Sequence, residues 1–230
     1  MSTLTLIRHG QARAFEKDSD RLSKVGEDQA SRLGEFWQRG AVRFDEVYTG
    51  TLERQKATGR IVAAAIKGFP EPVSIAGFDE YDAPGVLGAL VPELAARDQR
   101  FVAMVTDYER TRDNRTFQRV FEVAMRHWIS ASIPIAGVEP WTSFEARVLD
   151  GLRQIMGGAG NRRIAVFTSG GPIGLAVKHA MQSPSELFLD LHWRIRNCSL
   201  TDFVFSGARV TLDSFNAIPH LDDPSLWTYR

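Results

Sequence analysis

The chain has 230 residues, with 28 Lys or Arg balanced by 28 Asp or Glu, so its formal net charge at pH 7 is zero. This balance lacks the basic excess that is typical of nucleic-acid-binding proteins. A hydrophobic fraction of 43% is that of an ordinary globular protein, and no window approaches the roughly 18 apolar residues of a membrane helix. We therefore expect no nucleic-acid partner and no membrane partner.

The cysteine and histidine content argues against disulfides and metal centres. Cys198 is the single cysteine, so no intrachain disulfide can form. The histidines lack the close spacing of metal ligands; they are His9, His127, His179, His192 and His220. The N-terminal segment also lacks the basic and apolar regions of a signal peptide. These features predict a cytoplasmic protein with no metal and no cofactor.

Short apolar runs alternate along the chain with segments of helical period, a pattern typical of βα units. Strands are expected at residues 3–8, 47–48, 73–76 and 164–167, and the helices between and after them at 26–39, 52–66 and 173–182. Two further alternating runs, 199–205 and 209–215, flank Ser206-Gly207 and predict a hairpin.

The middle of the chain has a different character. Between about 91 and 131 the strand signal disappears, and apolar residues from Phe117 to Ile129 share one helical face. Pro84-Gly85 interrupts the pattern before this segment. After it, Thr142 followed three residues later by Glu145 predicts a capping box that opens another helix, which ends near Gly157.

These elements predict an α/β fold, a three-layer αβα sandwich with a mostly parallel sheet. We expect a single domain over residues 1–230, with a helical cap inserted at about 83–140. Ligands of such sheets bind at the carboxyl ends of the strands. The loops after residues 7, 48 and 167 are therefore the expected site.

Those loops contain residues suited to binding an anion. The first begins Arg8-His9-Gly10-Gln11, and a helix carrying Arg54 follows the second. Glycine permits close approach of a ligand to the backbone, and a guanidinium group binds phosphate oxygens bidentately. Either segment taken alone is more often a solvated surface turn.

Three segments, taken together, match the motifs of a known protein family. LTLIRHGQ at 4–11, LSKVG at 22–26 and YTGTLERQKAT at 48–58 occur in an order and spacing that resembles the histidine phosphatase (phosphoglycerate mutase-like) superfamily. The resemblance continues through Gly170-Gly171 to the tail at 215–221, and only the cap lies outside it. It implies a phosphoglycerate mutase-like fold and metal-independent phosphomonoester chemistry.

The resemblance also implies roles for individual residues. His9 matches the nucleophile that forms a phosphohistidine, and Glu80 matches the acid that protonates the leaving oxygen, with Asp79 and Asp82 as alternatives. The residues that match phosphate-binding positions or lie beside them are Arg8, Gln11, Arg54, Ser169 and Gly170.

Ser169 departs from the family pattern, because the family usually has a second histidine directly before the Gly-Gly pair. A serine hydroxyl can donate one hydrogen bond but carries no imidazolium charge. Losing a preorganised transition-state donor typically costs about 100- to 1,000-fold in rate. Pro172 suits the first turn of a helix, whose backbone amides could compensate in part.

The leading interpretation is a phosphomonoester phosphatase that acts through a phosphohistidine on a phosphorylated small molecule or a phosphoprotein. The alternatives are a non-catalytic phospholigand-binding or regulatory module, which Ser169 favours, and a phosphoglycerate mutase, which the missing histidine disfavours. In the cap, four arginines could contact a negatively charged substrate, although such a run is more often a solvated turn; they are Arg110, Arg112, Arg115 and Arg119. No other histidine matches a family position, and His127, His179 and His192 are expected to be packed, exposed or structural rather than catalytic.

Overall fold

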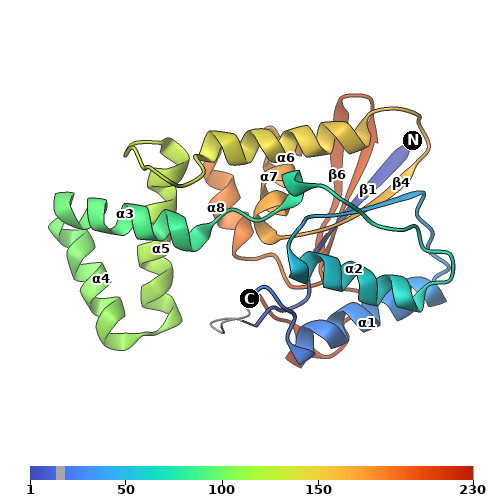
Figure 1. The fold of residues 1–230 in the computed structure, drawn as a ribbon, viewed down its shortest axis with the longest axis horizontal. Helices are drawn as coiled ribbons and strands as arrows, with labels where there is room; N and C mark the ends of the chain where they lie inside the picture. The colour runs from blue at the N-terminus through green and yellow to red at the C-terminus, as the bar shows by residue number, and fades with distance from the viewer. Residues whose placement is uncertain (14–18, 230) are drawn as a thin grey trace.

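The computed structural model describes residues 1–13 and 19–229 and contains a central six-stranded sheet (Figure 1). Its strands are β1 (Ser2–Arg8), β2 (Glu46–Thr49), β3 (Val73–Ser74), β4 (Arg163–Thr168), β5 (Leu200–Ser206) and β6 (Arg209–Ala217). The strand order is β3-β2-β4-β1-β5-β6. The first four strands in this order are parallel, whereas β5 and β6 are antiparallel to their neighbours. The mostly parallel sheet and the hairpin are therefore confirmed.

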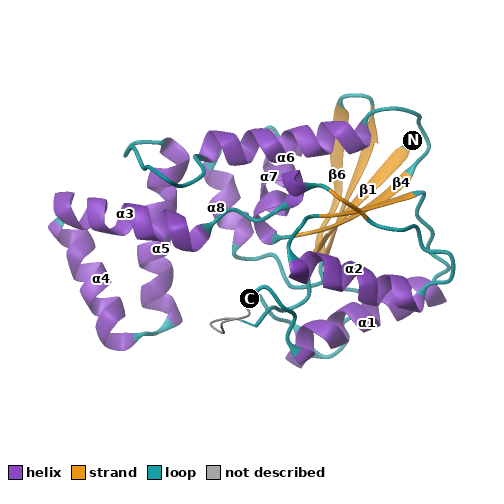
Figure 2. Cartoon of the chain, viewed as in Figure 1, coloured by secondary structure: helices purple, strands orange, loops and turns teal. Residues whose placement is uncertain are grey.

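Helices cover both faces of the sheet (Figure 2). One layer contains α1 (Lys24–Arg39) and α2 (Glu53–Ala65), and the other contains α6 (Trp141–Met156) and α7 (Gly170–Ala180). Because side chains alternate along a strand, Ile7 of β1 packs in the core with α1 and α2, while Leu4 and Leu6 pack in the opposite core. The α/β fold with three layers is thus confirmed.

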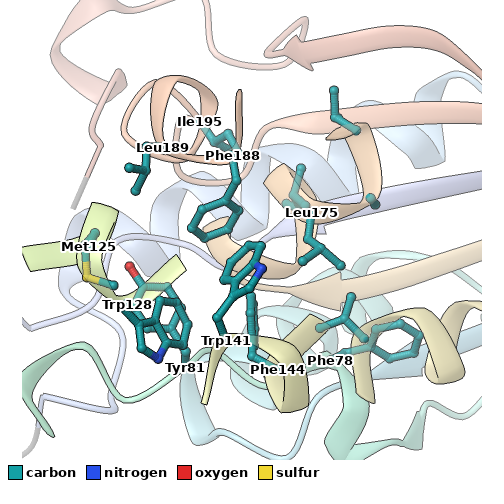
Figure 3. Close-up of a cluster of buried hydrophobic side chains, with 14 of the residues drawn as sticks. Phe78, Tyr81, Met125, Trp128, Trp141, Phe144, Leu175, Phe188, Leu189 and Ile195 are labelled. Atoms are coloured by element: carbon teal, nitrogen blue, oxygen red, sulfur yellow. The ribbon is translucent and has the colours of Figure 1, made fainter. Parts of the chain in front are cut away.

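The cap consists of α3 (Ala83–Arg97), α4 (Gln99–Thr111) and α5 (Asn114–Ser130), which project together from the layers (Figure 1). Aromatic side chains join α5 to the main body. Figure 3 shows Trp128 of α5 next to Tyr81, and the two rings stack with centroids 4.8 Å apart. Trp141 at the start of α6 packs edge-on against Phe188 of α8 (Glu186–His192), also at 4.8 Å. This cluster fixes the cap relative to the sheet.

Three local expectations are wrong. The capping box at Thr142 does not form, because α6 begins at Trp141 after Pro140, whose extended backbone precedes the helix, and no side chain caps it. Pro84 does not interrupt helical structure but lies in the first turn of α3. The backbone amides of a first turn make no hydrogen bond within the helix, so a proline there costs none. The third strand spans only residues 73–74, since the chain turns into a 3-10 helix at Ala76–Phe78.

The glycine pair after β4 also differs from the expected loop. Gly170 and Gly171 form the first turn of α7, and Ser169 is its N-cap residue. Their amides therefore point out of a helix N-terminus, which carries partial positive charge. Within residues 1–13 and 19–229, no helix is long and apolar enough to cross a membrane.

Candidate active site

The loops that follow β1, β2 and β4 meet at one edge of the sheet (Figure 1). Arg8 at the end of β1 is paired in register with Thr168 at the end of β4, and Thr49 at the end of β2 is paired with Phe167. Because the three strands are parallel and adjacent, the residues directly after them are brought together. This is the edge that the sequence indicated.

His9, in the loop directly after β1, is buried, with 5% of its surface exposed. Its Nδ1 atom lies 2.7 Å from the carbonyl oxygen of Gly10, and a carbonyl can only accept, so Nδ1 carries the hydrogen. The other ring nitrogen, Nε2, accepts a hydrogen bond from Nε of Arg54 at 3.2 Å. The neutral ring therefore presents an unprotonated Nε2 to the site.

The surroundings favour that neutral form. Burial lowers the pKa of His9 well below its ordinary value of 6.5, and the positive charges of Arg54 and Arg8 lower it further. The hydrogen bond to Gly10 opposes these effects but is the smallest of them. At neutral pH the imidazole is consequently a free base, as a nitrogen nucleophile must be.

Asp20 positions Arg54. One carboxylate oxygen of Asp20 accepts from Nη1 of Arg54 at 2.7 Å, and the other accepts the backbone amide of Glu53 at 2.8 Å. A single carboxylate thus binds both the guanidinium and the first amide of α2. Asp20 could not be identified from the sequence, because an acidic residue in a polar loop carries no signal until the fold brings it to Arg54.

Two hydrogen bonds from neighbouring elements fix the backbone of the loop that carries His9. The amide of Gly10 donates to the hydroxyl of Thr58 at 3.0 Å, and the side-chain amide of Asn197 donates to the His9 carbonyl at 3.1 Å. Gly10 packs so closely on α1 that a Cβ there would clash with the Gly26 carbonyl. The glycine of the motif is therefore required for packing.

Arg8 and Gln11, two expected phosphate ligands, lie on either side of His9 in the chain. Arg8 donates through Nη1 to the carbonyl of Ile195, and its Nε atom lies 3.7 Å from where a Cβ on Gly170 would be. Its guanidinium is thus next to the first turn of α7. Gln11 accepts a hydrogen bond from Ser23 at 2.8 Å through its side-chain oxygen. This bond engages the carboxamide oxygen, so the NH2 group is the end of the side chain that can donate to a ligand.

Ser169 is fully buried and lies against Gln55 of α2. Nε2 of Gln55 donates to its hydroxyl oxygen at 2.8 Å and also to the carbonyl of Phe78 at 3.0 Å. Because Ser169 accepts from Gln55, its own hydroxyl hydrogen is left to donate elsewhere. Sequence reasoning had not singled out Gln55, although it directly follows Arg54.

Glu80 lies between the arginines and the start of α7. One of its carboxylate oxygens accepts the amide of Gly171 at 3.0 Å, and a Cβ on Gly171 would overlap that carboxylate. Burial raises the pKa of Glu80 above 4.5, and the Gly171 amide, Arg54 and Arg8 counteract this in part. Glu80 therefore retains its proton to a higher pH than an exposed glutamate.

The two alternative acids form local backbone contacts. Asp79 accepts from the amide and the hydroxyl of Thr51. Asp82 is exposed and caps α3 by accepting the amide of Gly85 at 3.0 Å. The structure brings Glu80 next to the arginines, while Asp79 and Asp82 stabilise the neighbouring turns.

Arg147 of α6 holds the segment before and including Glu80. Its guanidinium pairs with Glu139 at 2.7 Å, and the same group donates to the carbonyls of Asp79 at 2.7 Å and Glu80 at 3.4 Å. It also lies 4.9 Å from the ring centre of Phe144. The position of the acid is therefore set by a partly buried cation that could not be identified from the sequence.

The described residues contain no group of three or more His, Cys, Asp or Glu side chains that could hold a metal ion. His127 contacts Ser132 in the cap, His179 lines a cavity with Met1 and Arg153, and His192 lies 3.3 Å from the Tyr81 hydroxyl. Of the cap arginines, Arg110 pairs with Asp107, and Arg112 stacks on Tyr108. Arg115 and Arg119 are exposed near the start of α5.

Residues 4–218 match the family model of the histidine phosphatase superfamily, branch 1. The chain belongs to the histidine phosphatase superfamily. No curated protein matches its sequence. The resemblance stated from the sequence motifs is thus confirmed over most of the chain.

Several solved structures share the fold of this chain. A histidine-to-alanine variant of phosphoserine phosphatase from Entamoeba histolytica, in complex with phosphoserine, aligns with a TM-score of 0.63 and 20% identity over 96% of this chain and 100% of that one. A putative alpha-ribazole-5′-P phosphatase from Escherichia coli K-12 gives 0.63 and 19%, covering 94% and 96%. Phosphoglycerate mutase from Bacillus anthracis gives 0.65 and 16%, covering 95% and 94%. The phosphoglycerate mutase-like fold is thereby confirmed.

Proposed function

We propose that this histidine phosphatase superfamily member is a metal-independent phosphomonoester phosphatase that works through a phosphohistidine at His9. The observation that carries the proposal is the state of that ring. Its Nδ1–H group donates a hydrogen bond to the Gly10 carbonyl, while Nε2 is unprotonated and lies 3.2 Å from Nε of Arg54. A nitrogen lone pair next to a phosphate-binding group is the arrangement that attack on phosphorus requires.

The reaction has two displacements. Nε2 of His9 attacks phosphorus, the bond from phosphorus to the ester oxygen breaks, and Glu80 gives its proton to the departing oxygen. The Glu80 carboxylate then takes a proton from water, which attacks the phosphohistidine and breaks its bond from phosphorus to nitrogen. Inorganic phosphate leaves, and His9 and protonated Glu80 are regenerated.

Transfer of a phosphoryl group requires stabilisation of charge on its three equatorial oxygens. Arg8 and Arg54 supply two permanent positive charges, and their planar guanidinium groups suit bidentate contact. Ser169 supplies a hydroxyl donor, Gly170 a backbone amide at a helix N-terminus and Gln11 an NH2 group. Because Ser169 is neutral, we expect slower turnover than a charged donor in its place would give.

Two other functions remain as alternatives. Ser169 favours a non-catalytic phospholigand-binding module, because the arginines and amide donors would still hold a phosphate. An unprotonated, buried His9 and a carboxyl with a raised pKa at Glu80 favour an enzyme, since simple anion binding needs neither. A phosphoglycerate mutase would have to retain and return the phosphoryl group, and product analysis would reveal it.

The test is hydrolysis of p-nitrophenyl phosphate in the presence of EDTA, across about pH 5 to 8, by the wild-type protein and His9→Ala. The matched control is His127→Ala, because that histidine lies in the cap, in contact with Ser132. We expect turnover by the wild type and the control that falls about 1,000-fold or more in His9→Ala. Equal rates in the wild type and folded His9→Ala would overturn the proposal.

A further inference from the structure

The C-terminal tail, residues 218–229, returns from the end of β6 to the loop that carries His9 (Figure 1). Two side-chain amides bind its residues 226–228; they belong to Gln29 of α1 and to Asn197 in the segment before β5. Both side chains are fully buried. The match to the family model ends at residue 218, so residues 226–228 are a feature of this chain that the family resemblance does not cover.

Gln29 joins the tail to one end of the His9 loop. Its Oε1 atom accepts the amide of Gln11 at 2.9 Å, and its Nε2 group donates to the Leu226 carbonyl at 2.7 Å and to the Thr228 hydroxyl at 2.9 Å. A backbone amide can only donate and a carbonyl can only accept, so these partners fix the orientation of the carboxamide. The hydroxyl oxygen of Thr228 therefore accepts from Gln29.

Asn197 joins the tail to the other end of the loop. Its Nδ2 group donates to the His9 carbonyl at 3.1 Å, which leaves Oδ1 to accept from the Thr228 hydroxyl at 2.9 Å. Its backbone amide donates to the Thr228 carbonyl at 2.9 Å. The next amide, that of Cys198, donates to the carbonyls of Arg8 at 3.1 Å and His9 at 3.3 Å. The backbone of the proposed nucleophile is thus bonded to a segment that the tail binds in turn.

The hydroxyl of Thr228 completes a chain of hydrogen bonds around the proposed nucleophile. It accepts from Gln29 and donates to Asn197. The bonds therefore run from the Gln11 amide through three side chains to the His9 carbonyl. Hydrogen bonds in such a buried network strengthen one another and rigidify the groups that they join. We propose that Thr228 is a positioning residue for His9, whose hydroxyl fixes the loop so that Nε2 points at phosphorus; the inference rests on the proposed function.

The arginines of the proposed phosphate site are held by other contacts. Asp20 binds the guanidinium of Arg54, and the carbonyl of Ile195 accepts from Arg8. Loss of the Thr228 hydroxyl should therefore misplace the nucleophile and leave phosphate binding intact. A misplacement of about 1 Å can cost about 100-fold in rate. A purely structural role would lower the stability of the fold without separating phosphoryl transfer from phosphate binding.

The experiment compares Thr228→Val, which removes the hydroxyl and keeps the shape, with Thr228→Ser, which keeps the hydroxyl. The measured quantities are kcat/KM for p-nitrophenyl phosphate and the inhibition constant of inorganic phosphate. We expect kcat/KM to fall about 10- to 100-fold in Thr228→Val, with the inhibition constant within about twofold of the wild type, and Thr228→Ser to retain most of the activity.

Thr116→Val is the matched control. The Thr116 hydroxyl also makes two hydrogen bonds, to the Thr111 hydroxyl and to the Asp113 carbonyl, but both lie in the cap. This variant should keep the kcat/KM of the wild type. Equal kcat/KM in Thr228→Val and the wild type would overturn the proposal. So would an equal loss in Thr228→Ser, or a phosphate inhibition constant that rises as much as kcat/KM falls.

Amide hydrogen exchange, followed by NMR, tests the positioning without catalysis. The amides of Gln11 and Cys198 make the backbone contacts at the two ends of the His9 loop. We expect both to exchange about 10-fold faster in Thr228→Val than in the wild type and in Thr228→Ser. This pattern in a wild type that hydrolyses no phosphomonoester would support the positioning and overturn only the phosphatase. Equal exchange rates in all three proteins would overturn the positioning.

Discussion

Nε of Arg54 donates a hydrogen bond to Nε2 of His9 across 3.2 Å, joining the first turn of α2 to the loop after β1. The bond directs a cation at the nitrogen that must attack phosphorus. The cation disfavours protonation of the ring and lies where the incoming phosphate needs positive charge. One contact therefore sets both the ionisation of the proposed nucleophile and the position of its anionic target.

Replacing Glu80 with glutamine tests its role as the acid. The amide is of the same size but cannot give up a proton, so hydrolysis of an alkyl phosphate should fall about 100-fold or more. An aryl phosphate with a weakly basic leaving group needs less protonation and should lose much less. Steady-state kinetics on both substrates measures the difference, and Asp82→Asn serves as control because Asp82 only caps α3. Equal losses on the two substrates would refute the role.

The pH profile follows from the same two groups. His9 must be unprotonated, and its pKa is well below 6.5, so lowering the pH through 6.5 should not cost activity. Glu80 must be protonated, and its pKa is raised above 4.5, so activity should decline as pH rises through that raised value. We predict that activity declines as the pH rises and that this alkaline limb is flatter in Glu80→Gln. A loss of wild-type activity with a midpoint near 6.5 on the acid side would contradict this assignment.

Asp20→Asn tests whether Asp20 positions Arg54. The amide preserves the shape but weakens the bonds to the guanidinium and to the amide of Glu53. We expect the inhibition constant of inorganic phosphate to rise about 10-fold, with only a small change in melting temperature. Asp28→Asn is the matched control, since Asp28 pairs with Arg32 on the exposed face of α1. Unchanged phosphate inhibition would show that Arg54 is positioned without Asp20.

Ser169→Ala removes the hydroxyl that stands where the family usually has a histidine. If that hydroxyl donates to the phosphoryl group, kcat/KM should fall about 100-fold. The free energy of unfolding should fall by only about 1 kcal/mol, because Gln55 retains its bond to the Phe78 carbonyl. Ser185→Ala is the control, being another helix N-cap serine whose side chain makes no capping bond. Wild-type kcat/KM in Ser169→Ala would show that the hydroxyl does not take part.

Sequence patterns predicted the layers because βα units have a strong signal. Apolar runs of four to six residues, such as that at Ile164, become buried strands when flanked by helices of clear period. Boundaries were less predictable. Thr142 followed by Glu145 satisfies the local rule for a capping box, yet the N-cap residue is Pro140, two positions earlier, and the helix begins at Trp141. A two-residue strand such as β3 depends on its pairing with Tyr48 and Thr49, which no local pattern records.

The candidate site was predictable only where a motif contains it. His9, Arg54 and Glu80 were identified from the family resemblance, and the fold brings them together. Asp20 and Arg147 were not, because each acts through a partner distant in sequence: Asp20 through Arg54, and Arg147 through carbonyls near residue 80. Such positioning contacts arise from tertiary structure and leave no periodicity or spacing in the sequence.

His220, near the start of the C-terminal tail, should make the fold sensitive to acid. Burial lowers its pKa from 6.5 to about 4, so below pH 6.5 the unfolded chain binds a proton that the folded chain does not. The contribution of His220 to the free energy of unfolding is therefore complete above pH 6.5. It falls by about 3 kcal/mol as the pH is lowered towards 4. Urea unfolding at several pH values measures the decline.

His220→Leu should reduce that decline, while the contribution of buried His9, which has the same sign, persists. An identical slope in His220→Leu and wild type would contradict the buried, neutral state of His220.

The central claim is the covalent intermediate on His9. The most direct measurement is rapid quenching of the wild-type protein with a ³²P-labelled phosphomonoester, followed by peptide mapping of the labelled protein. We predict a phosphoryl group on the peptide containing His9 that is stable in alkali and lost in acid, as a phosphorus–nitrogen bond requires, and that is absent from His9→Ala. Rapid turnover under the same conditions with no label on that peptide, or with label on another residue, would contradict the account.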